Sequence, residues 1–270
     1  MESSAGPRRL AVLGHPVGHS RSPAMQTAAL EALGLAGEWS YEAIDVAPDG
    51  FGDLVLSLPA AGFAGANVTV PHKGAALAVA DELSEVAREI GAANTLAFED
   101  GVVHAYNTDA AGLLAALPES PRERRALVLG AGGAARAVVW ALLREGAEVE
   151  VWNRTALRSR NLCGELGGAA VEDPDAAAYD LILNTTAVGL AGEDAFAELP
   201  LARGDLREGQ VLVDLVYGDS PSTLLAAAAE AGAETVDGIE VLVQQGAESL
   251  RLWTGREPPI EAMREAARSG

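Results

Sequence analysis

Strand-like and helix-like segments alternate along the first part of the chain, and a second alternating series starts near its middle. Leu10–Leu13 and Trp39–Ile44 are short runs typical of strands, and Pro23–Leu33 between them is typical of a helix. Strands that alternate with helices predict a mostly parallel sheet covered by helices. The chain is therefore predicted to be an α/β protein, in agreement with 49% hydrophobic and only 4% aromatic residues.

Two domains are expected, because 270 residues exceed the ~100–200 residues usual for one domain. The first series is predicted to continue with a helical stretch to about Leu58, a strand over Ala66–Val70, a helix over Asp81–Ile90, a strand over Asn94–Phe98 and a turn over Glu99–Gly101. The second series, starting at Arg125, is predicted to contain a helix to about Glu145, strands over Glu148–Asn153, Leu181–Asn184 and Val211–Leu215, and a helix over Leu224–Glu230. We predict one α/β domain over residues 1–105, a second over 106–240, and C-terminal helices over 241–270, broken around residues 255–259.

The net charge of -20 disfavours nucleic acid and anionic membranes as partners, because both would be repelled. Cys163 is the only cysteine, so no intrachain disulfide can form, and a reducing cytoplasm is expected. Met1–Arg9 lacks a long apolar core and no stretch approaches ~20 apolar residues, so neither secretion nor anchoring is expected. His15 and His19 are four apart, but the intervening proline and glycine disfavour a helix there, and no metal is predicted.

A glycine-rich turn, Gly130-Ala-Gly-Gly-Ala-Ala135, separates an apolar strand from an amphipathic helix. Glycines there allow a tight turn and let backbone N–H groups and the helix N-terminus approach a pyrophosphate. Ala135 is an accepted residue at the third position of this fingerprint. A glycine turn alone could be purely structural, but the strands on both sides favour a Rossmann dinucleotide-binding domain.

The loop after the second strand of this series is basic. In NAD-binding domains, an acidic residue roughly 20 positions further on binds the ribose hydroxyls. This chain instead has Asn153-Arg-Thr-Ala-Leu-Arg158, and two arginines with a threonine suit a 2′-phosphate. NADP is therefore the predicted cofactor, although an ordinary basic loop would have the same composition.

Lys73 lies just past a predicted strand, in the segment Asn67-Val-Thr-Val-Pro-His-Lys73. Pro71 is predicted to end this strand, because proline cannot donate a ladder hydrogen bond. An isolated lysine at such a place is more often solvent-exposed than functional. Whether Lys73 is a solvent-exposed or a functional lysine therefore depends on the other polar clusters of the chain.

Serine, asparagine and aspartate residues occur at several predicted element boundaries. Ser22 before Pro23 predicts a helix start with Ser22 as N-cap, and Ser20 with Ser22 could also hold a carboxylate. Asn94 stands at a strand start, and Asp109 could be a helix cap or a first-turn acid. Considered singly, each residue is explained by local structure alone.

Considered together, these segments resemble one family. In chain order they are Gly14-His-Pro-Val-Gly-His-Ser-Arg-Ser-Pro23, Asn67-Val-Thr-Val-Pro-His-Lys73, Gly91-Ala-Ala-Asn-Thr95, Asn107-Thr-Asp109, Gly130-Ala-Gly-Gly-Ala134, Asn153-Arg-Thr155 and Asp237-Gly-Ile-Glu-Val-Leu-Val-Gln-Gln245. This ordered set is similar to that of the shikimate dehydrogenases and spans nearly the whole chain. Only the glycine turn is shared widely among dehydrogenases.

The resemblance implies NADP-linked interconversion of 3-dehydroshikimate and shikimate, in the pathway to chorismate and the aromatic amino acids. It implies Lys73 and Asp109 as catalytic residues, with Lys73 as general acid in reduction and base in oxidation. The residues implied to bind substrate are Ser20, Ser22, Thr69, Lys73, Asn94, Asp109, Tyr217 and Gln245. Those implied to bind the cofactor are Glu85, Gly130, Ala131, Gly132, Gly133, Ala134, Asn153, Arg154, Thr155, Arg158, Leu215 and Gly238. The C-terminal helices are implied to pack on the first domain.

Three segments depart from the family pattern. Gln26-Thr27 stand where the family often has His-Asn, and we attribute this difference to packing. Val241 replaces a common methionine near the nicotinamide, which could alter the positioning of that ring. Gly218-Asp-Ser-Pro221 replaces Asn-Pro after Tyr217 and could shift the tyrosine side chain.

Two alternatives remain open. A quinate/shikimate dehydrogenase that uses NAD shares the scaffold, but Arg154 argues against an NAD preference. A non-catalytic protein that senses NADP or shikimate-pathway metabolites need not keep both Lys73 and Asp109, so their presence favours an enzyme. For the assembly, a monomer or a homodimer is expected.

Overall fold

The computed structural model describes residues 6–269, which form two compact α/β units. The first unit runs to Gly112 and resumes at Leu242, and the second runs from Leu113 to Val241. Of the N-terminal stretch considered above, residues 1–5 lie outside the described part. Within residues 6–269, every helix is too short or too polar to cross a bilayer. The first segment of the first unit, which ends at Gly112, extends several residues past the predicted boundary near residue 105.

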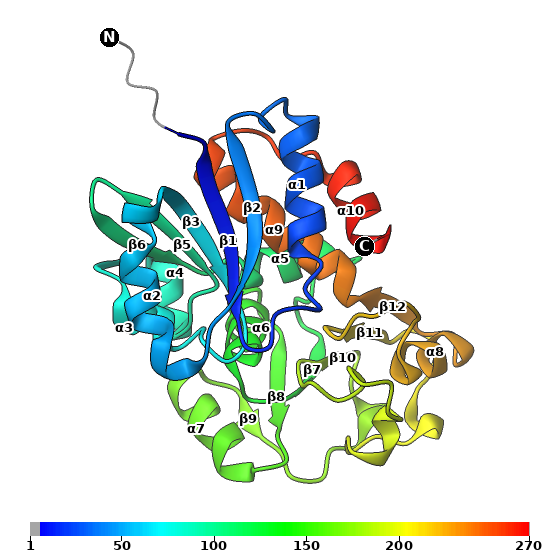
Figure 1. The fold of residues 1–270 in the computed structure, drawn as a ribbon. Helices are drawn as coiled ribbons and strands as arrows, with labels where there is room; N and C mark the ends of the chain where they lie inside the picture. Colours follow the sequence, from blue (N-terminus) through cyan, green and yellow to red (C-terminus); the bar gives the residue numbers. More distant parts are fainter. Residues whose placement is uncertain (1–5, 270) are drawn as a thin grey trace. The chain divides into compact units, whose positions relative to one another are not determined.

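The sheet of the first unit has the strand order β2-β1-β3-β5-β6-β4 (Figure 1). Its strands are β1 (Arg8–Gly14), β2 (Trp39–Asp45), β3 (Phe63–Val68), β4 (Glu82–Leu83), β5 (Thr95–Glu99) and β6 (Val102–Tyr106). β1 pairs in parallel with β2 and β3, whereas β5 is antiparallel to both β3 and β6. The carboxyl ends of β1, β3 and β6 and the amino end of β5 consequently meet at one edge of the sheet.

The predicted turn between β5 and β6 is a two-residue hairpin loop. Asp100 and Gly101 both have positive φ, at 50° and 81°, as a type I′ turn requires. The helix predicted over Asp81–Ile90 is partly wrong, because Glu82–Leu83 form β4 beside β6 and the helix α4 spans only Glu85–Ile90. Ser84 caps this helix by accepting a hydrogen bond from Ala87 N.

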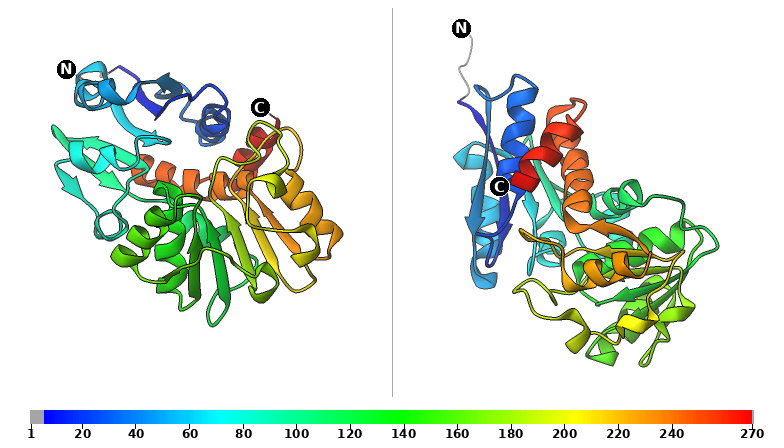
Figure 2. Two further views of the ribbon diagram at one scale, coloured as in Figure 1. Left: turned by 90° about the horizontal axis from the view of Figure 1, so that it is seen from below. Right: turned by 90° about the vertical axis from the view of Figure 1, so that its right-hand side faces the viewer.

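The helices of the first unit are α1 (Ser22–Ala32), α2 (Phe51–Ser57), α3 (Ala75–Val79), α4 and α5 (Asp109–Ala116), together with α9 (Gly238–Thr254) and α10 (Ile260–Ser269). α5 and α9 each cross a unit boundary. α10, from the end of the chain, lies beside α1 from its beginning (Figure 2). The predicted break near residues 255–259 separates α9 from α10.

The start of α1 differs from the prediction. The helix begins at Ser22, the cap position is Arg21, and the Arg21 side chain makes no cap hydrogen bond. Instead, Ser20 Oγ accepts a hydrogen bond from Ser22 N at 3.3 Å. Pro23 suits the first turn of a helix in either register, so the sequence signal located the helix but assigned the hydroxyl to the wrong serine.

The second unit contains a wholly parallel sheet in the order β12-β11-β10-β7-β8-β9. Its strands are β7 (Arg125–Leu129), β8 (Glu148–Trp152), β9 (Ala169–Ala170), β10 (Leu181–Asn184), β11 (Val211–Asp214) and β12 (Glu234–Asp237), with helices α6 (Gly133–Arg144), α7 (Ala156–Leu166) and α8 (Thr223–Glu230). Numbered along the chain, the six strands lie in the order 3-2-1-4-5-6 of a doubly wound dinucleotide-binding sheet. The order reverses between β7 and β10, where such sheets bind their ligand.

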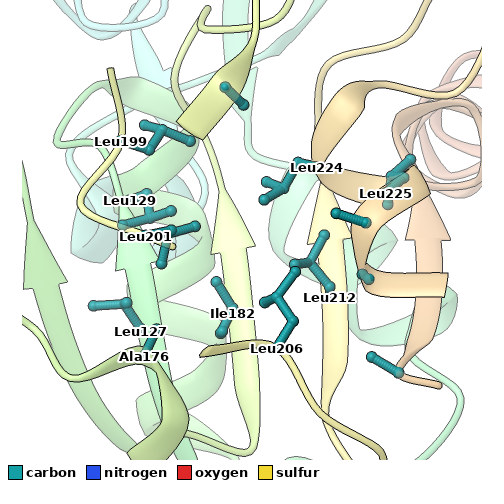
Figure 3. Packing of buried hydrophobic residues seen from close by; sticks show 14 of the residues in the cluster. Leu127, Leu129, Ala176, Ile182, Leu199, Leu201, Leu206, Leu212, Leu224 and Leu225 are labelled. Atoms are coloured by element: carbon teal, nitrogen blue, oxygen red, sulfur yellow. The ribbon is translucent and has the colours of Figure 1, made fainter. Parts of the chain in front are cut away.

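One face of this sheet packs against α8 and the loops that precede β11 (Figure 3). Leu127 and Leu129 of β7, Ile182 of β10 and Leu212 of β11 point into the same cluster as Leu224 of α8. Burial of these leucines contributes roughly 1.5–3 kcal/mol each. The predicted α/β class is confirmed in both units, with two mostly parallel sheets.

Candidate active site

Lys73 is not the solvated surface charge that an isolated lysine would suggest. Its side chain is only 14% exposed, and Nζ donates a hydrogen bond to Asp109 Oδ2 at 2.6 Å. The strand that leads to it ends at Val68 rather than at Val70, so the prediction that Pro71 ends the strand is wrong. Thr69 to Lys73 form a loop beyond the sheet, and Val70 in that loop is 67% exposed.

Backbone hydrogen bonds hold this loop on three sides. Thr69 N donates to Leu13 O, His15 N donates to Val70 O, and Ala93 N donates to Lys73 O. Next to the lysine, the buried His72 ring stacks on Phe51 with 4.5 Å between ring centroids. Lys73 is therefore carried by a fixed backbone, as a catalytic group requires.

Both carboxylate oxygens of Asp109 are bound. Oδ2 accepts from Lys73 and Oδ1 accepts from Asn94 Nδ2 at 2.8 Å. Asn107 Oδ1 accepts from the backbone N–H groups of Asp109 and Ala110, so Asn107 supplies the local turn cap. The capping role considered for Asp109 thus belongs to Asn107, and the aspartate is free to face the lysine.

Gln245 of α9 completes this group. Its Oε1 accepts from Asn94 Nδ2 at 3.0 Å, and its Nε2 donates to Leu242 O at 2.8 Å. A Cβ at Gly112 of α5 would lie 2.6 Å from Gln245 Cβ, so only glycine allows the two helices this approach. The structure therefore brings together Lys73, Asn94, Asp109 and Gln245.

Ser20, Ser22 and Thr69 follow strands that end at the same edge of the sheet. Ser20 and Ser22 come after β1, and Thr69 comes after β3 with its Cγ2 only 2.5 Å from where a Gly14 Cβ would lie. Ser22 is 4% exposed. These three residues thus stand at the sheet edge at which Asn94 directly precedes β5.

Asp45 is a residue of this edge that the sequence did not single out. It ends β2 opposite Gly14, its Oδ2 accepts from Val17 N at 3.1 Å, and its Oδ1 lies 2.7 Å from His15 Nδ1. The hydrogen bond with His15 lowers the pKa of the Asp45 carboxyl below its ordinary range. Its position at the carboxyl end of a strand beside β1 is the signal that could have identified it as the anchor of this loop.

Gln26, one of the departures from the family pattern, is fully buried in α1. Its Nε2 donates to Gly246 O on α9 at 2.9 Å. A Cβ at Gly246 would lie 2.4 Å from Met25 Cε, so α1 and α9 are in close contact. This geometry agrees with the attribution of Gln26 to packing.

In the second unit, the glycine turn lies at the reversal of strand order. Gly130 has φ of 118°, and a Cβ there would lie 2.4 Å from Thr185 Oγ1, so glycine is required. A Cβ at Gly132 would meet no described atom within 4 Å, which leaves its backbone open to a ligand. Gly132 also precedes α6 without a side-chain cap, so the N–H groups of that helix start can bind an anion.

The predicted basic loop borders a hollow of about 310 Å³. Asn153, Arg154, Thr155 and Arg158 line it, together with Thr186 and Glu198. Arg154 is 87% exposed, and its Nη1 lies 3.9 Å from Glu198 Oε2. A guanidinium at the rim of a hollow beside the glycine-turn strand fits a phosphate substituent on the ribose.

The other residues implied for the cofactor lie in three places. Gly238 contacts Leu215 closely, because a Cβ there would lie 2.5 Å from Leu215 O. Glu85 begins α4 in the first unit, where its side chain is exposed. Ala131, Gly133 and Ala134 form the glycine turn and the start of α6.

Tyr217 follows β11 in a loop that Asp214 fixes. The buried Asp214 accepts hydrogen bonds from Ser222 Oγ at 2.5 Å, Asn184 Nδ2 at 2.9 Å and Val216 N at 3.1 Å. Burial raises the pKa of Asp214, and these hydrogen bonds oppose the increase. Gly218 to Ser220, which replace part of the family pattern, are exposed between the anchored ends of this loop.

An α/β chain with one doubly wound dinucleotide-binding unit, and with a lysine–aspartate pair at a sheet edge of its other unit, falls in the class of Rossmann-type nucleotide-dependent enzymes. Three family profiles match this chain: the shikimate dehydrogenase substrate binding domain over residues 12–96, shikimate/quinate 5-dehydrogenase over residues 114–189, and the shikimate 5′-dehydrogenase C-terminal domain over residues 238–268.

Individual proteins match over nearly the whole chain. The shikimate dehydrogenase (NADP(+)) of Methanocella arvoryzae is 42% identical, over 95% of this chain and 97% of its own. A crystal structure of the Thermus thermophilus enzyme with NADP(H) and shikimate is 44% identical, with a TM-score of 0.88 over 97% of this chain and 99% of that one. Another shikimate dehydrogenase, crystallised with NADP+, is 34% identical, with a TM-score of 0.91 over 97% of this chain and 95% of that one. This chain belongs to the shikimate dehydrogenase family.

Proposed function

We propose that this chain catalyses the reversible, NADPH-dependent reduction of 3-dehydroshikimate to shikimate, on the way to chorismate and the aromatic amino acids. The observation that carries the proposal is the hydrogen-bonded group of Lys73, Asp109, Asn94 and Gln245 at one sheet edge. The choice of substrate and cofactor is supported by relatives that match over nearly their whole length and are named shikimate dehydrogenase (NADP(+)).

In this proposal the substrate carboxylate is bound by the hydroxyls of Ser20 and Ser22, with Tyr217 assisting. Thr69, Lys73, Asn94, Asp109 and Gln245 surround the ring hydroxyls. Ser20 Oγ already accepts from Ser22 N, so its hydroxyl hydrogen points elsewhere and can be donated to a carboxylate. The Gln245 amide nitrogen has two hydrogens, and Leu242 O takes one of them.

Lys73 is proposed to hold and move the proton of the reaction. NADPH, when bound, supplies the hydride that reduces the ketone carbon. Negative charge then develops on the ketone oxygen, and the Lys73 ammonium stabilises that charge and donates a proton to it. In the reverse direction the neutral amine accepts the hydroxyl proton. Asp109 orients the lysine through the 2.6 Å contact, and Asn94 fixes the other carboxylate oxygen.

The second unit fits NADP in three respects. Gly130 makes the tight turn, Gly132 leaves room for a pyrophosphate, and the start of α6 offers N–H groups to it. Asn153, Arg154, Thr155 and Arg158 would hold the 2′-phosphate, and Leu215 and Gly238 would lie on the nicotinamide side. Glu85 remains a proposed cofactor contact that rests on the family resemblance alone.

Replacing Arg154 by glutamine should raise the KM for NADP roughly 10- to 100-fold, the range for one lost charge-assisted hydrogen bond. The KM for NAD should change little, because NAD lacks the phosphate. Steady-state kinetics with both cofactors provides the measurement. The matched control is Arg160→Gln, since Arg160 stands on α7, the helix that follows Arg154, but pairs with Glu172 outside the hollow. Equal losses with NADP and NAD would contradict the assignment.

The function itself is tested by adding shikimate or quinate to the protein with NADP or NAD, and following reduced nicotinamide by absorbance. Shikimate with NADP should give the highest kcat/KM. Preference for quinate with NAD would establish the first alternative, and ligand binding without turnover would establish the sensor. No signal in any combination would refute the proposal.

The cellular site and the assembly also remain proposals. We propose that the enzyme works in the cytoplasm, because its single Cys163 permits no intrachain disulfide. A monomer or a homodimer is proposed for the assembly. Sedimentation velocity across a range of concentrations distinguishes the two.

A further inference from the structure

A stripe of three side chains on α9 faces three consecutive residues, Asn94 just before β5 and Thr95 and Leu96 at its start. Gln245, Ser249 and Trp253 are spaced four apart, so they lie on one face of the helix. Gln245 Oε1 accepts from Asn94 Nδ2 at 3.0 Å, and Trp253 Nε1 donates to Leu96 O at 2.9 Å. Between them, Ser249 Oγ lies 2.8 Å from Thr95 Oγ1. Here we call these three pairs the α9–β5 seam.

Ser249 is the centre of the seam and is fully buried. Its Oγ accepts from Asn67 Nδ2 at 2.9 Å and lies 3.2 Å from Thr108 Oγ1. Asn67 is held from its other end by Tyr41 Oη, which donates to Asn67 Oδ1 at 2.8 Å. One hydroxyl of α9 is thus tied to β3, to β5 and to the turn before α5.

Two glycines make room for the ends of the seam. A Cβ at Gly65 of β3 would lie 2.2 Å from Trp253 Nε1, and a Cβ at Gly112 of α5 would lie 2.6 Å from Gln245 Cβ. The helix therefore rests directly on the backbone at both ends. A shift of one helical turn, about 5.4 Å, would separate the buried hydroxyls and amides of the seam from their partners.

We propose that Ser249 is a positioning residue for substrate recognition, acting through the seam. The seam fixes α9 lengthwise and in rotation on β5, and so sets Gln245 against Asn94 at the ring-binding group. Asn94 in turn binds Asp109 Oδ1, while the contact between Asp109 and Lys73 involves no atom of the seam. This inference rests on the proposed shikimate activity, and it adds residues that would not touch substrate.

The first variant is Ser249→Ala. Loss of the hydroxyl should raise the KM for shikimate roughly 3- to 15-fold, as expected for one lost neutral hydrogen bond near a binding group. The KM for NADP should stay within about 2-fold, and kcat should fall less than the KM rises, because Lys73 and Asp109 keep their contact. Trp253→Phe, which removes only the donor to Leu96 O, should raise the shikimate KM in the same direction by a smaller factor.

The control is Val243→Ala, a fully buried position on α9 that lies outside the stripe. It should lower Tm at least as much as Ser249→Ala while leaving the shikimate KM near its original value. Ser249→Cys retains a weak donor and acceptor in similar volume and should restore part of the lost affinity.

The outcomes separate this inference from the proposed function. If the wild type turns over shikimate and Ser249→Ala has the same KM for shikimate as the wild type, the inference is overturned and the proposed function stands. An equal KM rise in Val243→Ala also overturns it, because any loosening of α9 would then suffice. Absence of turnover in the wild type is a failure of the proposed function. In that case amide hydrogen exchange tests whether the seam holds α9 in place. Ser249→Ala should speed exchange in residues 242–254 more than Val243→Ala does.

Discussion

Replacing Lys73 by alanine should lower the turnover of shikimate by roughly 10²–10⁴-fold, the range for a lost acid–base group, while shikimate should still bind. The loss is expected because, of the two side chains described above as donating to the Asp109 carboxylate, Lys73 and Asn94, only the Lys73 amine can give up and take back a proton near neutrality. Turnover is measured with NADP and excess shikimate. Binding of shikimate is measured by calorimetry in the absence of NADP, so that no turnover occurs. Near-normal turnover in this variant would show that another group moves the proton.

Lys73→Arg is the matched control for charge. A guanidinium can keep an ion pair with Asp109, but its pKa above ~12 prevents it from giving up a proton near neutrality. If the lysine acted only through its positive charge, Lys73→Arg would retain most of the turnover. We expect it to be nearly as slow as Lys73→Ala.

Gly132→Ala should reduce the affinity for NADP roughly 10²–10³-fold without lowering Tm. Its Cβ would enter space that no described atom occupies within 4 Å, so the substitution should not lower the free energy of unfolding. The methyl group would stand where the pyrophosphate must approach, and loss of about two charge-assisted hydrogen bonds accounts for the magnitude. Fluorescence titration with NADPH measures the affinity, and unchanged affinity would place the pyrophosphate elsewhere.

Gly130→Ala provides the contrast on the same turn. A side chain there meets Thr185 Oγ1 at 2.4 Å and requires a φ of 118°, which only glycine adopts readily. Strain and overlap of about 2–4 kcal/mol should lower Tm by roughly 5–10 °C, with or without cofactor. We expect Gly132→Ala to weaken NADP binding without a change in Tm, and Gly130→Ala to lower Tm. Thermal unfolding of both variants measures this difference in Tm.

The sequence located most elements of both units, because apolar periodicity and glycine or proline punctuation are local properties. β10 was predicted with its observed bounds, and the turn at Asp100-Gly101 followed from its composition. β4 was missed because two residues carry no periodicity, and their strand character depends on pairing with His104 and Ala105 of β6. Ala66–Val70 was extended too far because the alternation of side chains continues into a loop.

The candidate site was predicted less completely than the fold. Motif order led to Lys73, Asn94, Asp109 and Gln245, and the structure brings these four together. Asp45 and Ser249 were missed because their partners come from distant segments, such as Val17 for Asp45 and Asn67 for Ser249. A hydroxyl or carboxylate gives no local sign of which remote group it will bind, so only the assembled sheet reveals such supports.

The largely buried ammonium of Lys73 has a chemical consequence. Lys73 is the only lysine in the chain, so every other side-chain cation apart from histidine is a guanidinium. An amine-selective reagent such as formaldehyde with borohydride can therefore modify only this site and the terminal α-amino group. The rate of labelling at a peptide containing Lys73, followed by mass spectrometry, becomes a direct reporter of how tightly Asp109 and any bound ligand shield that nitrogen.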